Sequence, residues 1–136
     1  MFDFNALIIQ QLTINQGKKR EIMTLKEVAA ILNAEVICGH WKLDREVRAV
    51  FASDLMSDVL TIDSDKLLLL TGLVNIQTIR TSEMSDIQNI VLVRNKKASP
   101  EMISMAEENG IIILQCSYSM YKSCGLLFQN GLNPVY

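Results

Sequence analysis

The chain has 136 residues, of which 49% are hydrophobic and 21% charged, and its formal net charge is −2. A chain of this size and apolar content can bury the core of one domain without disulfides or metal ions. The acidic balance, with no basic stripe, excludes a nucleic-acid partner, and every apolar run is far shorter than the roughly 20 residues that a membrane-spanning helix needs.

Residues 1–22 differ in composition from the rest of the chain. They are rich in Gln and Asn and carry a basic cluster at 18–20, which is typical of a solvated charge run. They lack the basic start and the unbroken apolar run of a secretory signal. We therefore expect an amino-terminal arm or extension over 1–22 and a single α/β domain over 23–136.

A helix cap and two apolar runs predict the first elements of the domain. Thr24 and Glu27 have the spacing of a capping box, and the apolar residues after Thr24 recur at helical spacing, which predicts a helix over 25–32. Strands are predicted over 34–38 and 46–52. Because a short loop joins these two strands, we expect them to run antiparallel to each other.

A short helix is predicted over 55–60, directly after the second strand. Ser53 and Asp54 precede this helix, and their side chains are expected to cap it. Three further strands are predicted over 67–71, 89–93 and 111–115. All three are continuous apolar runs, which indicates a sheet that is covered on both faces.

Helices alternate with these three strands. Ser99 followed by Pro100 begins one of them, and the segment 117–119 opens the last one. Strand–helix–strand order predicts parallel strands joined by right-handed crossovers. The fold class is therefore a layered α/β domain around a mixed, mainly parallel sheet of about five strands.

Five phrases of the chain are characteristic in combination: LNAEVICG, LDREV with FASDLMSDVL, LLLLTGLVNIQTIRTSEMSDI, ASPEMISMAEENGI and YSMYKSCGLLFQNGL. Over residues 23–132 the chain resembles the DRTGG domain family, in particular the small stand-alone members encoded beside iron-only hydrogenase genes. Related domains are attached to phosphotransacetylases, to CBS-containing pyrophosphatases and, more distantly, to the amino end of HPr kinases. The resemblance implies a DRTGG-like fold and a regulatory or dimer-forming role, without a catalytic set.

This chain departs from the family pattern, because it has no contiguous Asp-Arg-Thr-Gly-Gly run and has Arg94-Asn95-Lys96 where many relatives carry Thr-Gly-Gly. In open α/β sheets, ligands sit outside the carboxyl ends of the parallel strands. We call the residues expected at those ends the strand-end rim: Ser53, Asp54, Thr71, Gly72, Arg94, Asn95, Lys96, Ser117, Tyr118 and Ser119.

The strand-end rim combines hydroxyl groups, a glycine, cations and helix amino termini, and such a set can bind an anion through free N–H groups. The simpler interpretation is that the hydroxyl and carboxylate groups cap helices and that the cations are solvated. This simpler interpretation is favoured, because helix caps are common and each stabilises its helix by about 1 kcal/mol.

The three cysteines, Cys38, Cys116 and Cys124, are widely spaced, with no CxxC pair. Iron–sulfur clusters commonly need four close thiolates, so we interpret the cysteines as free, buried thiols in a reducing, cytoplasmic setting. His40, the one histidine, lies in a predicted turn and is interpreted as a surface residue. No metal ion or cofactor is expected.

These features predict a non-catalytic regulatory or protein-interaction module that acts as a homodimer. No nucleophile, base and orienting group can be named together, and an apolar surplus in a small domain is often buried between copies. Two alternatives stay open. One is a sensor that binds a nucleotide or another phosphorylated metabolite at the strand-end rim. The other is a redox or iron–sulfur accessory protein associated with hydrogenase, with a protein partner in redox metabolism.

Overall fold

The structure is a computed structural model that describes residues 3, 5, 6 and 22–136. The expected amino-terminal arm over 1–22 therefore lies almost entirely outside the described residues. The helices are α2 (Leu25–Leu32), α3 (Met56–Val59), α4 (Ile76–Met84), α5 (Pro100–Glu108) and α6 (Met120–Gln129), with a 3-10 turn η1 (His40–Lys42). The strands are β1 (Met23–Thr24), β2 (Glu35–Cys38), β3 (Glu46–Val47), β4 (Ala49–Ala52), β5 (Leu67–Thr71), β6 (Asn89–Leu92), β7 (Ile112–Gln115) and β8 (Asn133–Pro134).

Six strands form the main sheet in the order β2-β7-β6-β5-β4-β8. The pairs from β7 to β8 are all parallel, and β2 joins β7 in the antiparallel sense. Strands β1 and β3 form a separate two-stranded antiparallel sheet. The prediction of a mixed, mainly parallel sheet is confirmed, with one strand more than expected.

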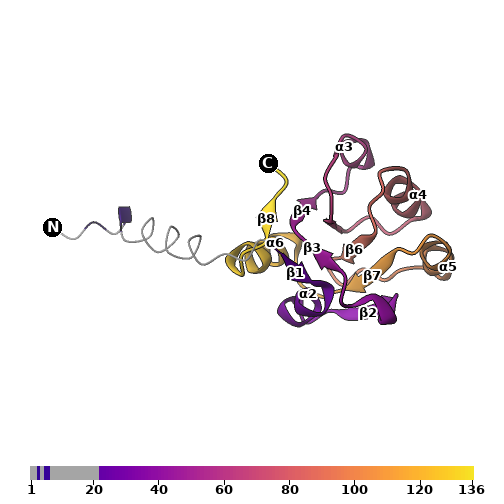
Figure 1. Cartoon of the computed structure of the whole chain (residues 1–136), viewed down its shortest axis with the longest axis horizontal. Helices are drawn as coiled ribbons and strands as arrows, with labels where there is room; N and C mark the ends of the chain where they lie inside the picture. The colour runs from indigo at the N-terminus through magenta and orange to yellow at the C-terminus, as the bar shows by residue number, and fades with distance from the viewer. Residues whose placement is uncertain (1–2, 4, 7–21) are drawn as a thin grey trace.

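Helices cover both faces of this sheet, which gives three layers (Figure 1). The fully buried residues of β5 alternate between the layers: Leu68 and Leu70 belong to one hydrophobic cluster, and Leu67 and Leu69 to the other. The first cluster includes residues of α2 and α6, and the second includes residues of α3, α4 and α5. The apolar runs predicted to be covered on both faces are therefore confirmed, because a strand between two helical layers has no solvent side.

The first two predicted strands run antiparallel to each other, as expected, because β2 is antiparallel to β7 and the strands from β7 to β4 are parallel. They are not neighbours in the sheet. The segment 46–52 is divided into β3, which pairs with β1, and β4, which pairs with β5 and β8. β2 lies at the other end of the sheet beside β7, so three strands separate it from β4. The loop between β2 and β3 is bound to the start of α2. The Leu25 N–H donates to the Arg45 carbonyl at 2.9 Å, and the Lys26 N–H donates to the Leu43 carbonyl at 3.0 Å.

The edge strand β8, which contains Pro134, was not predicted. Proline lacks an N–H group and is tolerated at a sheet edge. The ladder continues past it, because the Val135 N–H donates to the Val50 carbonyl at 3.2 Å. The carboxyl end of the chain thereby becomes the outermost strand beside β4.

Local helix signals are mostly confirmed. The side chains of Thr24, Ser99 and Ser119 accept hydrogen bonds from backbone N–H groups three residues on, at 3.1 to 3.2 Å. Asn75 caps α4 in the same way at 3.3 Å, although its role was not singled out from the sequence. Each of these side chains satisfies one of the free N–H groups in the first turn of its helix.

The cap expected at α3 is wrong. Leu55 is the residue before α3, and no side-chain hydrogen bond caps the helix. Ser53 accepts a hydrogen bond from the Leu55 N–H at 3.0 Å, before the helix begins. The Asp54 carboxylate points to a different set of donors, which belong to neighbouring strands.

Candidate functional site

The carboxyl ends of four neighbouring strands, β4 to β7, meet at one edge of the sheet because these strands are parallel and in close register. The strand-end rim is therefore assembled from loops that are far apart in the sequence. Its centre is Asp54, in the loop after β4.

Three donors converge on the Asp54 carboxylate. The Thr71 hydroxyl and the Gly72 N–H donate to Oδ1 at 3.1 and 2.6 Å. The guanidinium of Arg94 forms an ion pair with Oδ2 at 2.9 Å. Hydrogen bonds between charged partners are about twice as strong as neutral ones, which explains why Asp54 takes these donors instead of capping α3.

The charge state of Asp54 follows from these contacts. Partial burial on its own would raise the pKa of the carboxyl group. Hydrogen bonds from Gly72, Arg94 and Thr71, together with the positive charge of Arg94, outweigh that effect and lower the pKa below its ordinary value. The side chain is 41% exposed, so solvent screens the pair and its net contribution to folding is modest.

Gly72 leaves the space in which the Arg94 side chain lies. A Cβ atom at position 72 would collide with the guanidinium group of Arg94. The backbone of Gly72 has no positive φ angle, so space and not conformation distinguishes glycine here. A side chain at this position would require the exposed end of Arg94 to shift from its place beside Asp54.

A tight turn fixes the backbone of Arg94. Arg94 and Asn95 both have left-handed backbones, with φ angles of 61° and 59°, and the Lys96 N–H closes the turn on the Val93 carbonyl at 3.2 Å. Two consecutive positive φ angles are typical of a type I′ turn. For residues other than glycine such angles cost about 1 kcal/mol or more each, so other contacts must hold the turn.

The loop after β7 holds that turn. The Arg94 N–H donates to the Tyr118 carbonyl at 2.8 Å, and the Asn95 N–H donates to the Cys116 carbonyl at 3.0 Å. The backbone N–H groups of 94–96 are therefore bound within the protein. The Arg94 guanidinium was expected to face an anion, and in the structure it is paired with the Asp54 carboxylate.

The remaining residues of the strand-end rim lie around this centre. The side chains of Asn95 and Lys96 are exposed, as is Ser117. Ser119 caps α6, and the Lys122 ammonium group lies over the Tyr118 ring, 3.9 Å from its centroid. The structure thus brings Asp54, Thr71, Gly72 and Arg94 into direct contact and places the others at the periphery.

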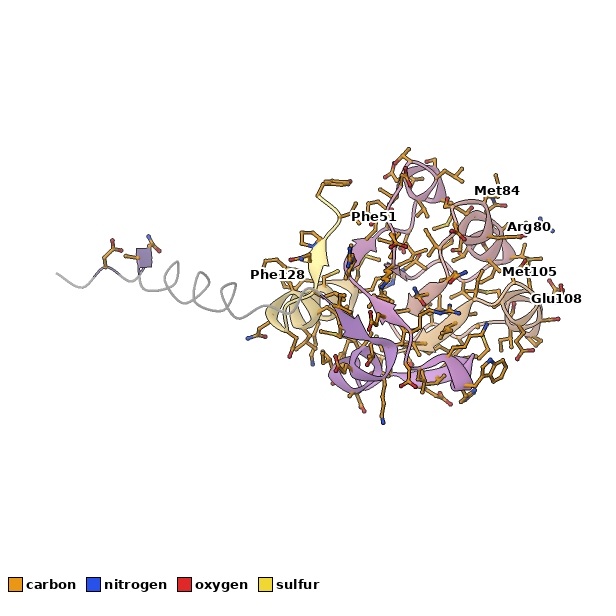
Figure 2. The ribbon with its side chains drawn as sticks, viewed as in Figure 1. Phe51, Arg80, Met84, Met105, Glu108 and Phe128 are labelled. Carbon is orange, nitrogen blue, oxygen red and sulfur yellow. The ribbon has the colours of Figure 1, made fainter. Side chains whose placement is uncertain are left out.

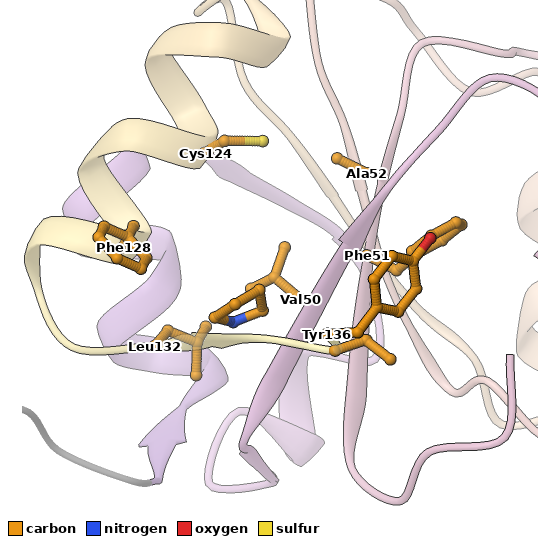
Figure 3. A pocket seen from close by; sticks show the side chains of 9 residues that line it. Val50, Phe51, Ala52, Cys124, Phe128, Leu132 and Tyr136 are labelled. Carbon is orange, nitrogen blue, oxygen red and sulfur yellow. The ribbon is translucent and has the colours of Figure 1, made fainter.

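A second feature lies at the β8 end of the sheet, where an apolar pocket of about 270 Å³ opens between β4, α6 and β8 (Figure 3). Its lining consists of Val50, Phe51, Ala52, Cys124, Phe128, Leu132, Pro134, Val135 and Tyr136. None of their side chains carries a formal charge. We call this surface the β8 edge; it was missed because β8 itself was not predicted.

The comparisons with known proteins bear on the fold. No protein-family model matches the chain, and no curated protein matches it. A solved structure that is similar contains the CBS and DRTGG domains of the regulatory region of Clostridium perfringens pyrophosphatase, in complex with its activator diadenosine tetraphosphate. The TM-score is 0.65 at 14% sequence identity, and the match covers 99% of this chain and 53% of that chain.

The chain has a DRTGG-like fold. The resemblance inferred from the sequence phrases is confirmed at this level. The chain spans about half the length of the C. perfringens structure. The match therefore bears on the fold of this chain and not on its activity or ligands.

The cysteines of the DRTGG-like domain are separated from one another. Cys38 and Cys116 belong to different hydrophobic clusters on opposite faces of the sheet. The Cys38 thiol donates to the Ile111 carbonyl at 3.4 Å, and the Cys116 sulfur lies 3.5 Å from the Ser123 hydroxyl. Burial raises the pKa of Cys38 and of Cys124, which makes both thiols less reactive.

Among residues 22–136 and the few described before them, no group of three or more His, Cys, Asp or Glu side chains is arranged to hold a metal ion. Within the same part of the chain, none of the helices combines the length and the apolar character that spanning a membrane requires.

Proposed function

We propose that the DRTGG-like domain is a non-catalytic regulatory module that acts as a homodimer and associates through the β8 edge. The observation that carries this proposal is the apolar pocket between β4, α6 and β8, whose lining includes exposed aromatic side chains. Phe128 is 47% exposed and Tyr136 is 89% exposed. Large aromatic residues on an uncharged surface are the composition found at the core of protein interfaces.

A second copy of the chain is the proposed partner. Most soluble oligomers are symmetric, and a twofold interface uses the same patch on both subunits. The β8 edge suits this arrangement because its pocket and its projecting aromatic groups lie side by side, so each copy can offer a side chain to the pocket of the other. β8 is also the last strand of the sheet order, and such edges are usually covered.

Contacts within the protein engage the groups that catalysis would need. Asp54 is paired with Arg94, the Cys38 thiol is buried, and the Cys124 thiol is partly buried with a raised pKa. This supports a regulatory role and assigns no residue to a chemical step.

Light scattering on the full chain tests the proposal. We expect a dimer at micromolar concentration, and a monomer for Phe128→Glu, because a charge at the mouth of the apolar pocket must be buried on association. Met84→Glu is the matched control, since Met84 is 74% exposed and lies on α4, on the other side of the molecule (Figure 2). A monomeric full chain would contradict the proposal.

A second candidate function is a sensor of a nucleotide or another phosphorylated metabolite at the strand-end rim. The convergence of Thr71, Gly72 and Arg94 on one point favours it, and the C. perfringens regulatory region of similar fold is complexed with a nucleotide activator. Thermal unfolding of the full chain with diadenosine tetraphosphate, ATP or inorganic phosphate tests it. We expect stabilisation by at least one of them and its loss in Arg94→Ala.

The association with hydrogenase, a redox partner and the cytoplasmic location stay predictions from the sequence. The separation of Cys38 and Cys116 onto opposite faces of the sheet gives the iron–sulfur alternative no support within one copy of the chain. Iron analysis of anaerobically purified protein tests that alternative.

A further inference from the structure

The three donors around Asp54 are oriented as well as close. The Thr71 hydroxyl accepts a hydrogen bond from the Leu73 N–H at 3.2 Å and donates its own hydrogen to Asp54 Oδ1. The Gly72 N–H points to the same oxygen. The Arg94 guanidinium reaches the second oxygen from the opposite loop. Together they form a cradle for a group that bears two oxygens on one atom.

Two of the three donors are fixed in place, whereas the acceptor is not. Thr71 is fully buried at the end of β5, and Gly72 is a buried backbone position beside it. The backbone of Arg94 is anchored by the Tyr118 carbonyl. Asp54, in contrast, is an exposed loop residue with a short side chain that can rotate into solvent. Removal of its carboxylate from the cradle leaves the Thr71 and Gly72 donors where they are, while the Arg94 side chain, which is 43% exposed, stays anchored to the rim through its backbone.

We propose that the centre of the strand-end rim is a preorganised oxyanion site that Asp54 keeps filled, and that a phosphoryl group binds there by replacing the Asp54 carboxylate. The inference rests on the sensor function proposed above as the second candidate. A phosphoryl group presents two oxygens from one atom, as a carboxylate does, so the Gly72 N–H, the Thr71 hydroxyl and the Arg94 guanidinium can serve it in the same way.

The replacement gives the ligand a structural effect. Asp54 lies two residues before α3, and while it is bound it fixes the loop between β4 and α3 to the end of β5. Its release frees that loop at one end. The free energy that the phosphoryl group must supply to displace Asp54 sets the threshold for the response, because a ligand shifts a two-state element only by its differential affinity.

The test uses inorganic phosphate and three forms of the full chain. In Asp54→Ala the cradle is open, and we expect phosphate at about ten times its dissociation constant to raise the unfolding midpoint by roughly 3–6 °C. In the wild type we expect a clearly smaller rise. Asp58→Ala is the matched control, because it removes an exposed aspartate of α3 with the same change in net charge but opens no donor group.

The double variant Asp54→Ala, Arg94→Ala should lose the gain. A folded Asp54→Ala that does not respond to phosphate overturns the proposal, and so does an equal response of Asp58→Ala. If Asp54→Ala does not fold, Asp54→Asn replaces it, because the amide keeps the size of the side chain and removes the charge that competes with phosphate. In that variant a phosphate-dependent shift of the Gly72 amide resonance is expected, and its absence overturns the proposal.

The sensor function and the displacement of Asp54 can fail separately. A wild-type chain that no nucleotide stabilises, together with an Asp54→Ala variant that binds phosphate, removes the sensor function and supports the self-filled site. Loss of the phosphate response from Asp54→Ala, with a wild type that still binds a nucleotide through Arg94, removes the displacement and keeps the sensor.

Discussion

The strand-end rim and the β8 edge differ in how their surface groups are satisfied. At the rim, every donor at the centre has a partner from the same chain: Asp54 accepts from Thr71, Gly72 and Arg94. At the β8 edge, an apolar pocket remains open between α6 and the last strand. Polar groups in proteins can satisfy one another, whereas exposed apolar surface is removed from water only by burial.

Different interactions dominate in the two regions. Contacts at the β8 edge are hydrophobic and depend on buried area, so substitutions there should change the free energy of unfolding or of association strongly. Contacts at the rim are screened by solvent, since the side chains of Asp54 and Arg94 are 41% and 43% exposed. Substitutions there should change ligand response more than stability.

The largest effect is expected at the β8 edge. Leu132→Ala removes a side chain that is 2% exposed and leaves a cavity, so we expect a loss of about 2–4 kcal/mol in the free energy of unfolding. Chemical denaturation measures it. Phe128→Ala, at an exposed position on the same surface, should cost clearly less; equal losses would mean that burial does not distinguish these two residues.

The next effect tests the space beside Arg94. Gly72→Ala should displace the Arg94 side chain and weaken its ion pair, with a loss of up to about 1 kcal/mol because the pair is exposed to solvent. Gly125→Ala is the matched control, since a Cβ there meets nothing within 4 Å and lies within α6, where alanine is favoured over glycine by about 0.5–1 kcal/mol. Denaturation of both variants should give opposite signs, and equal signs would contradict the packing at position 72.

A smaller effect is expected from the charge of Asp54. Its pKa is lowered in the folded chain, so its contribution is present above the unfolded value and is lost as the pH falls through the folded value. We expect Asp54→Asn to be less stable than the wild type by no more than about 1 kcal/mol at neutral pH. Denaturation at several pH values should show the difference disappearing below about pH 4, and a difference that grows there would contradict the lowered pKa.

The smallest effect concerns the periphery of the rim. Lys122→Met removes the ammonium group from the Tyr118 ring, and exposed cation–π contacts are worth about 0.5–1 kcal/mol. The side chain of methionine has a similar length, so packing should be retained. Thermal unfolding should show a shift of no more than a few degrees, and a larger one would mean that Lys122 has a partner beyond this ring.

Features that depend on neighbouring residues in the sequence were predicted well. The caps at Thr24, Ser99 and Ser119 use donors three residues away, and the buried strands are continuous apolar runs. Asp54 was assigned to a helix cap by the same local reasoning. Its actual partners, Gly72 and Arg94, lie 18 and 40 positions further along the chain, and a carboxylate prefers a full positive charge to a single backbone N–H.

Pairing over long distances was predicted poorly for a related reason. β2 lies beside β7 and β8 beside β4, and neither pair is joined by a short turn that would mark it in the sequence. The two-residue strand β8 carries almost no pattern of its own. The β8 edge could be found only after the sheet order was known.

The sheet order also has a kinetic consequence. Val36 pairs with Leu114, and Val50 pairs with Pro134, so both margins of the sheet are completed by segments from the second half of the polypeptide. During synthesis on a ribosome, β2 emerges long before its neighbour β7, and β4 emerges long before its outer neighbour β8. Loop closure over such separations slows folding, so both of these outer pairings are expected to form late.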